Sequence, residues 1–570
     1  MTRRKFAVAL LLITLTFAGF PLHAQQPQST APAPKDPNDP IERIKDEGLN
    51  RSQVMQTLSY LTDVIGPRLT ASPNLKRANE WTRDKMKEWG LENARLEAWG
   101  PFGRGWSLKS FTAEVSAPQA FPLIAFPKAW SPGTNGAVTN DVALVEAKDE
   151  TELAKYKGAL KGKFVLSAPL REVKAWFDAP GRRMTEKQLL ELADAPDPAK
   201  DRAGGPMAMM SNPRMLEFIK AAVFDVKKLK FFYDEGAALV IAPSRSGDGG
   251  TIFLEAADAP REIKAEAPMQ AAMELFMSRV NAWDQNAPPT LPQITVAIEH
   301  YNRLVRIIKA GEKAQVRVNL DVQFHNDDLM AYNTVAEIPG SDKKDELVMV
   351  GAHMDSWHSG TGATDNGAGC AVALEAVRIL KALNLRPRRT IRVGLWSGEE
   401  QGLLGSQAYV KEHFGERADA TTPQARMAAM MGGGGPAKIN TKPDYEKFSA
   451  YFNLDNGTGK IRGVYLQGNE AVRPIFREWL TPFRDMGATT LSASNTGGTD
   501  HLSFDAIGLP GFQFIQDEVE YSTRTHHSNM DVFDRIQADD MKQAATIMAA
   551  FLYQAAMREE KLPRKGTAAK

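Results

Sequence analysis

The second half of the chain alternates between short apolar runs and longer stretches in which apolar residues recur every three or four positions. The short runs are typical of buried strands and lie at 347–352, 390–396, 448–454 and 511–516. The longer stretches predict helices at about 366–384, 402–414, 469–487 and 538–560. Strands that alternate with helices predict an α/β fold, with a mixed, largely parallel sheet sandwiched by helices.

The first half of the chain contains two regions that differ in their pattern of apolar residues. Val54, Leu58, Leu61 and Ile65 recur at helical spacing, and a second helix is predicted at about 74–89. Further along, short strand-like runs lie among Gly- and Pro-rich turns, at 142–145, 164–166 and 238–241. We therefore predict three parts of the folded chain: a main domain at 41–120 plus 310–560, an inserted β-rich domain at 121–309, and a C-terminal tail at 561–570.

The N-terminal residues have the pattern of an export signal. Three basic residues at 3–5 precede an apolar run at 6–20, and 22–24 resemble a cleavage site, which predicts a signal peptide at 1–24. Residues 25–40 contain five prolines and predict a disordered spacer. No later apolar run reaches the roughly 18 residues that a membrane helix needs, so we expect an exported protein, periplasmic or secreted, with no membrane partner.

Composition narrows the function classes further. The 570 residues contain 70 Lys and Arg against 69 Asp and Glu, so no basic excess is available to neutralise the phosphates of a nucleic acid. Cys370 is the single cysteine, which excludes an intramolecular disulfide. Its apolar neighbours predict a buried thiol.

Histidine and carboxylate residues follow the predicted strands at the points where the strands end. Since functional residues gather at the carboxyl ends of strands in α/β sheets, these side chains are expected at one rim. They are His353, Asp355, Glu399, Glu400, Asp455 and the pair His526-His527, with Asp365 at the start of a helix. Imidazole and carboxylate ligands favour Zn²⁺, with Mn²⁺ or Co²⁺ as substitutes. Two such ions sharing one carboxylate would activate a water and polarise a carbonyl. A glutamate that binds neither ion would move the proton from the water to the leaving amine.

Several motifs resemble the co-catalytic zinc exopeptidase family, which includes aminopeptidases and glutamate carboxypeptidases. The resemblance is strongest to its carboxypeptidase Q branch and covers about 45–560. It rests on the stretches Ile65–Leu69, His353–Trp357, Glu399–Gly402, Gly498–Asp500 and His526–Ser528. The inserted domain is similar, more loosely, to the protease-associated domain of that family.

The resemblance implies a role for each motif residue. Glu399 would be the general acid/base, and two zinc ions would be held by His353, Asp365, Glu400, Asp455 and His527, with Asp365 bridging. His527 is preferred to His526 because the family places the ligand a few residues before an acidic residue, here Asp531. Asp355 would accept a hydrogen bond from His353, and Asp500 and His501 would support the ligands or shape the substrate pocket.

The implied activity is hydrolysis of short peptides or dipeptides, and we favour attack at the free N-terminus. Carboxypeptidase or dipeptidase specificity is an alternative within the same fold. A glutaminyl cyclase with one zinc ion and a catalytically inactive, receptor-like binding protein are two further alternatives. The partners expected from this interpretation are small peptides, with a homodimer compatible with the carboxypeptidase Q-like pattern.

Overall fold

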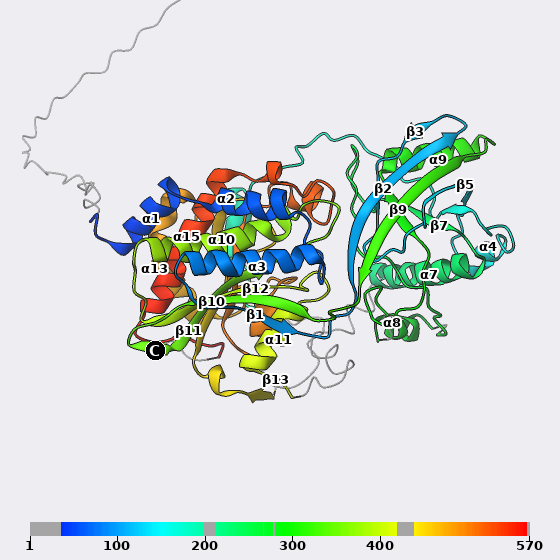
Figure 1. Cartoon of the computed structure of the whole chain (residues 1–570). Coiled ribbons are helices and arrows are strands. Elements are labelled where there is room, and N and C mark those ends of the chain that lie inside the picture. Colours follow the sequence, from blue (N-terminus) through cyan, green and yellow to red (C-terminus); the bar gives the residue numbers. More distant parts are fainter. Residues whose placement is uncertain (1–35, 199–212, 266, 278–279, 419–437, 567–570) are drawn as a thin grey trace, which may run out of the picture.

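Two eight-stranded sheets organise the protein into two lobes that lie side by side (Figure 1). The computed structural model describes residues 36–198, 213–265, 267–277, 280–418 and 438–566. The predicted signal peptide and all but the last residues of the predicted spacer lie outside these ranges.

The sheet of the first lobe is mixed, with a parallel centre. Its strands, in spatial order, are β1 (Glu92–Trp99), β10 (Ala331–Ile338), β12 (Arg389–Trp396), β11 (Lys343–His353), β15 (Phe448–Asn453), β18 (Gly511–Gln516), β16 (Ile461–Tyr465) and β17 (Thr490–Ser492). The four central strands β12, β11, β15 and β18 run parallel, so their carboxyl ends meet at one edge. The four strands that we predicted in the second half of the chain are these central strands.

Helices cover both faces of this sheet, which confirms the predicted α/β sandwich. One face packs on α10 (Ala368–Ala382), α13 (Arg473–Leu480), α15 (Ala538–Met557), α1 (Pro40–Asn50) and α2 (Val54–Ser59). The other packs on α11 (Leu404–His413) and α14 (His501–Asp505), while α3 (Pro73–Glu88) lies against β1 and β10. Along β11, Val348 and Val350 face the first core and Leu347 and Met349 the second, as expected where strand side chains alternate.

One predicted helix is broken into three. The stretch 469–487 forms a 3₁₀ turn at Glu470–Val472, the helix α13, and a second 3₁₀ segment at Thr481–Met486. A proline lies in the first turn of each of the last two elements, Pro474 and Pro482. Because proline has no N–H to donate to the preceding turn, each one starts a new segment rather than continuing the last.

The second lobe is built on a sheet whose longest pair of strands leads out of the first lobe and back into it. Its strands, in spatial order, are β3 (Phe121–Pro122), β2 (Gly105–Ala117), β9 (Gln315–His325), β5 (Ala137–Leu144), β6 (Phe164–Leu166), β7 (Leu239–Pro243), β8 (Gln293–Val296) and β4 (Ala125–Pro127). The lobe therefore takes in residues on both sides of the predicted insert at 121–309. That it is a protease-associated domain stays a prediction.

The second lobe also contains helices that we did not predict. It contains α4 (Glu150–Ala154), α5 (Glu186–Ala193), α7 (Pro213–Asp234), α8 (Pro268–Met277) and α9 (Ile298–Lys309). The longest of these, α7, has apolar residues beyond its buried stripe, among them Phe218, which is 64% exposed. Its helical periodicity is therefore blurred in the sequence.

Two further predictions concern the apolar segments of the chain. Within the described ranges, no helix combines the length and apolarity required to cross a bilayer. Cys370 is fully buried in α10, as predicted, and its thiol donates a hydrogen bond of 3.0 Å to the backbone carbonyl of His353. This contact ties α10 to the last residue of β11.

Candidate metal centre

The predicted ligands converge at the carboxyl edge of the first sheet. His353 is the last residue of β11, Asp455 lies just beyond β15, and Glu399 and Glu400 follow β12. Asp365 lies in the short segment Ala363–Gly367, which leads into α10, and its own backbone is not helical, with φ −131° and ψ 87°. Parallel strands bring these loops together because all of their carboxyl ends meet at the same edge.

The first half of the centre is formed by one imidazole and two carboxylates. His353 Nε2 lies 3.2 Å from Asp365 Oδ1 and 3.5 Å from Asp455 Oδ2. All three side chains are buried. Donor atoms of these residues lie within 4.8 Å of one another, a spacing that could hold a metal ion.

The second half faces the other oxygen of the same carboxylate. His527 Nε2 lies 3.3 Å from Asp365 Oδ2 and 2.9 Å from Glu400 Oε2. His526 Nε2 is farther away, at 3.7 Å from Asp365 Oδ2, and its side chain is more exposed than that of His527. Asp365 thus presents one oxygen to each half, which is the disposition of a bridging ligand.

The loop that carries Asp365 is held by a second buried carboxylate. Asp531 accepts hydrogen bonds from the backbone N–H groups of Thr364 and Asp365, at 2.5 and 3.2 Å. Asp531 follows His527 by four residues, so one segment supplies both an imidazole of the centre and the anchor of the shared carboxylate.

Glu399 lies beside this arrangement rather than inside it. Its Oε2 is 4.0 Å from His353 Nε2, and its side chain is 10% exposed at the rim. Burial raises the pKa of Glu399 well above the ordinary value, and although His353 opposes this shift, the carboxylates of Asp455 and Asp500 add to it. A carboxylate of raised basicity at the edge of a metal centre suits proton transfer.

The donor atoms of the centre lack protein partners that would satisfy them. His353 Nε2, Asp365 Oδ2 and Glu400 Oε1 are buried and receive no hydrogen bond from the described residues. Burial by itself lowers the pKa of both imidazoles, yet the surrounding carboxylates outweigh it: chiefly Glu399 and Asp455 hold the pKa of His353 well above its ordinary value, and chiefly Glu400 and Asp365 do so for His527. Buried carboxylates with unsatisfied oxygens and neighbouring imidazoles fit a divalent cation that prefers nitrogen and oxygen ligands.

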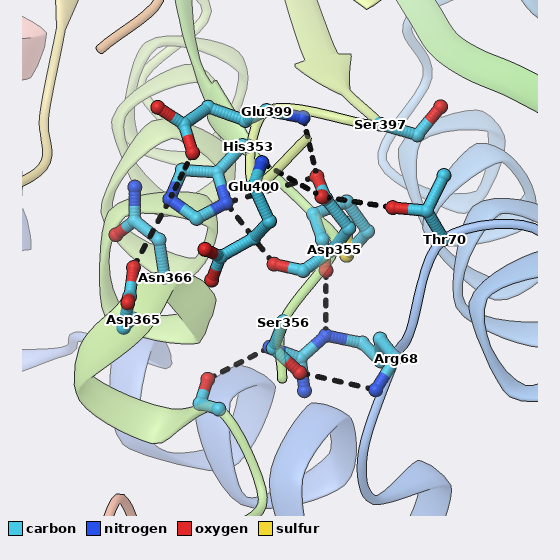
Figure 2. Close-up of polar contacts among 12 residues, drawn as sticks. Arg68, Thr70, His353, Asp355, Ser356, Asp365, Asn366, Ser397, Glu399 and Glu400 are labelled. Carbon is cyan, nitrogen blue, oxygen red and sulfur yellow. Dashed lines mark hydrogen bonds and ion pairs between the residues drawn. The ribbon is translucent and has the colours of Figure 1, made fainter. Parts of the chain in front are cut away.

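Asp355 contacts the centre in a different way from the one predicted. The imidazole Nδ1 of His353 lies 3.0 Å from the backbone carbonyl of Asp355, whereas the Asp355 carboxylate is 3.7 Å away (Figure 2). That carboxylate instead accepts hydrogen bonds from the backbone N–H groups of Glu399 and Glu400, at 3.3 and 3.2 Å, and from the Thr70 hydroxyl at 3.0 Å. The backbone carbonyl therefore orients the imidazole, and the side chain holds the Glu399–Glu400 loop.

We expect Asp355→Ala to lower kcat/KM by about 10–100-fold, the usual effect of removing a group that orients metal ligands. Both backbone N–H groups lose their acceptor, so Glu399 and Glu400 become displaced from the rim. Thr70→Val removes a donor to the same carboxylate but leaves the loop contacts, and a smaller loss is expected. Steady-state kinetics of the two variants checks this order, and equal losses would contradict it.

Arg68 is a fully buried residue that ties the N-terminal helices to the loop between His353 and Asp365. Its guanidinium donates to five backbone carbonyls, those of Leu61, Gly66, Met354, Thr361 and Gly362. Its backbone also exchanges hydrogen bonds with Ser356 (Figure 2). One side chain thus fixes the path of the chain between two residues of the centre.

Arg68→Met is expected to lower the free energy of unfolding by about 3–5 kcal/mol, because the five carbonyls lose a buried donor. Denaturant titration measures this change. Arg83→Met provides a matched control, since Arg83 is partly exposed and pairs with its neighbour Asp84. A loss no greater than that of the control would show that the network does not stabilise the fold.

Asp500 and His501 are both fully buried. Burial raises the pKa of Asp500 to about 7, and its charge acts on Glu399 and His353. The imidazole Nε2 of His501 lies 3.2 Å from the backbone carbonyl of Thr496. Neither residue is among those that line the cavity beside Asp455.

A cavity of about 270 Å³ opens beside Asp455, with a lining that includes Asn456, Gln513 and Glu518. One wall comes from the connection between β6 and β7 of the second lobe. Arg182 in this connection exchanges two backbone hydrogen bonds with Val519, at 2.9 and 3.1 Å, and α5 packs against β17. The second lobe therefore helps to enclose the space next to the centre.

Sequence reasoning missed a contact between the second lobe and the centre. Glu255 Oε1 lies 3.0 Å from His527 Nδ1. Burial by itself raises the pKa of Glu255, but His527 and Arg245 outweigh it and lower the pKa to about 2, so this group carries a negative charge. Glu255 belongs to no motif and lies 272 positions from its partner, so no local signal could have identified it.

The chain is similar in sequence to known peptidases. Residues 333–552 match the sequence profile of peptidase family M28. Carboxypeptidase Q of Mus musculus is 24% identical over 519 residues, which are 91% of this chain and 88% of the mouse protein. Carboxypeptidase Q of Rattus norvegicus is 30% identical over 280 residues, 49% of this chain and 53% of the rat protein, so that match spans about half of the relative.

Two solved structures have the same fold. A peptidase M28 precursor from Shewanella amazonensis has a TM-score of 0.59 at 21% identity, over 92% of this chain and 98% of that chain. A zinc aminopeptidase from Bacillus subtilis has a TM-score of 0.51 at 18% identity, over 89% of this chain and 96% of that chain. The shared architecture is mixed sheets flanked by helices.

Proposed function

Because residues 333–552 match peptidase family M28, we propose that the chain is an exported dinuclear zinc exopeptidase, which removes residues from the free N-terminus of short peptides or dipeptides. The observation that carries this proposal is the position of Asp365, whose two carboxylate oxygens lie 3.2 and 3.3 Å from the imidazoles of His353 and His527. A shared carboxylate between two half-sites supports two ions rather than the single zinc of a cyclase.

Each half-site has its own ligands. His353 and Asp455 would hold one ion, His527 and Glu400 the other, and Asp365 both. Bound zinc would supply Lewis-acid polarisation of the scissile carbonyl and a water of lowered pKa. Related proteins with a zinc aminopeptidase or carboxypeptidase Q description support the metal and the reaction class.

Glu399 would move the proton during hydrolysis. Its carboxylate is placed at the rim, 4.0 Å from His353, and the Asp355 carboxylate holds its backbone. The raised pKa of Glu399 lets it accept a proton from the attacking water and release that proton to the leaving amine. A carboxylate with an ordinary pKa would be a weaker base for this exchange.

The cavity beside Asp455 supports a small substrate. Its volume of about 270 Å³ lies just below the usual range for ligand sites, so it accommodates the end of a peptide rather than a long chain. Because Arg182, Asn456 and Gln513 line it, we expect polar side chains to be accepted there. Export is supported by the basic and apolar pattern of residues 1–20.

The proposal is tested by incubating zinc-loaded protein, residues 25–570, with matched free and N-acetylated dipeptides and short peptides. Mass spectrometry of the products is expected to show cleavage of the free-amine substrates and at least about a tenfold slower reaction after acetylation. Equal rates would favour carboxypeptidase specificity. Pyroglutamate formed from Gln peptides with one zinc per chain would favour a cyclase, and a protein that neither binds metal nor hydrolyses peptides would favour a receptor-like role.

A further inference from the structure

The segment that carries His527 pairs with a segment of the second lobe. Phe253 and Ser528 form an antiparallel β-bridge, and the backbone N–H of Leu254 donates to the His527 carbonyl at 3.1 Å. Asn529 adds three hydrogen bonds, two with the backbone of Ile252 and one with the Gly250 carbonyl. The loop of the predicted ligand is thus bound to the second lobe.

His527 needs such support because its backbone has a φ of +59°. This left-handed conformation costs a non-glycine residue about 1–2 kcal/mol, so it persists where the surroundings fix it. The imidazole also packs edge-on against Trp357, with ring centroids 5.8 Å apart, and Trp357 contacts Trp130 of the second lobe. The backbone and one edge of the ring are therefore both constrained.

The orientation of the ring is completed by Glu255. Its Oε1 lies 3.0 Å from His527 Nδ1, on the side of the imidazole opposite to Asp365 and Glu400. Arg245 Nη1 contacts the same oxygen at 2.5 Å and holds the carboxylate in place. A proton donated from Nδ1 to a carboxylate leaves Nε2 free to bind a metal and increases its basicity.

We propose that Glu255 is a positioning residue for the ion held by His527, so that the second lobe completes the metal centre. This inference rests on the proposed dinuclear function. It assigns the second lobe a direct part in metal affinity, in addition to enclosing the cavity beside Asp455. The other half-site has its own support, since the Asp355 backbone carbonyl faces His353 Nδ1.

The test compares zinc binding by the wild-type chain, Glu255→Ala and Glu255→Gln, measured by competition with a chelator. Glu255→Ala is expected to weaken the binding of one of the two ions by about 10–100-fold and to leave the binding of the other unchanged. Glu255→Gln keeps an oxygen that accepts from Nδ1, so a smaller loss is expected. The absorption spectrum of the cobalt-substituted proteins provides a second readout, with a change expected for one of two ions.

Glu262→Gln is the matched control, because this carboxylate of the second lobe has a side chain that is 69% exposed. The thermal midpoint of each metal-free variant checks that the fold is retained, and Glu255→Gln keeps the test available should the alanine variant not fold. Unchanged affinity for both ions in a folded Glu255 variant would overturn the inference and leave the proposed function standing. A wild-type chain that binds fewer than two ions would instead overturn the proposed function, and this inference with it.

Discussion

Glu399→Gln is expected to lower kcat by about 10²–10⁴-fold, the range usual for loss of a general acid/base. Glutamine keeps the shape and polarity of the side chain but cannot accept the proton of the attacking water. Glu399 lies at the rim, with its Oε2 4.0 Å from His353 Nε2, and it is assigned to neither ion, so the zinc content is expected to equal that of the wild type. Single-turnover kinetics with metal analysis of the same samples measures both quantities.

Glu478→Gln, an exposed glutamate on α13, is the control for the charge change. Loss of activity together with loss of zinc in Glu399→Gln would contradict the assignment, because it would make Glu399 a ligand. Retained activity would assign the proton transfer to another group, for which Asp500, a buried carboxyl of raised pKa whose charge acts on Glu399, is a candidate.

The parts of the centre that could be predicted from sequence are those that follow strand ends. The apolar runs that became β11, β12 and β15 located His353, Glu399 and Asp455, because a buried parallel strand is readable as a continuous apolar segment. The common edge of these strands then brings the three side chains together without any knowledge of rotamers. The apolar pattern of the strands and the topology of the sheet therefore predict the same site.

What could not be predicted depends on side-chain direction and on distant segments. The resemblance implied a contact between His353 and Asp355, but which oxygen of Asp355 makes it is decided by the turn that follows β11. Arg68 appeared in a motif, yet its five carbonyl partners come from two separate segments, 61–66 and 354–362. Glu255 shows the same limitation most strongly, since only the packing of the second lobe brings it to His527.

Because the second lobe contacts the centre, the chain is not simply a peptidase domain with a separable insertion. The bridge at Phe253 and Ser528, the contact from Glu255 and the wall formed by Arg182 all come from residues between β6 and β8. A separable lid would leave the centre intact when removed. The observed contacts instead predict that removing the second lobe disturbs the half-site of His527 before that of His353.

Asp365→Asn is expected to have the largest effect of any single substitution, with loss of both zinc ions and at least about a 10³-fold lower rate of hydrolysis. The carboxylate oxygens lie 3.2 and 3.3 Å from the two imidazoles, so neutralising this one group weakens both half-sites together. Zinc content after dialysis and the rate with free-amine dipeptides are the two measurements. Asp539→Asn is the control, because its side chain is 92% exposed on the first turn of α15. Loss of a single ion, with the other bound as in the wild type, would show that Asp365 belongs to one half-site and does not bridge the two.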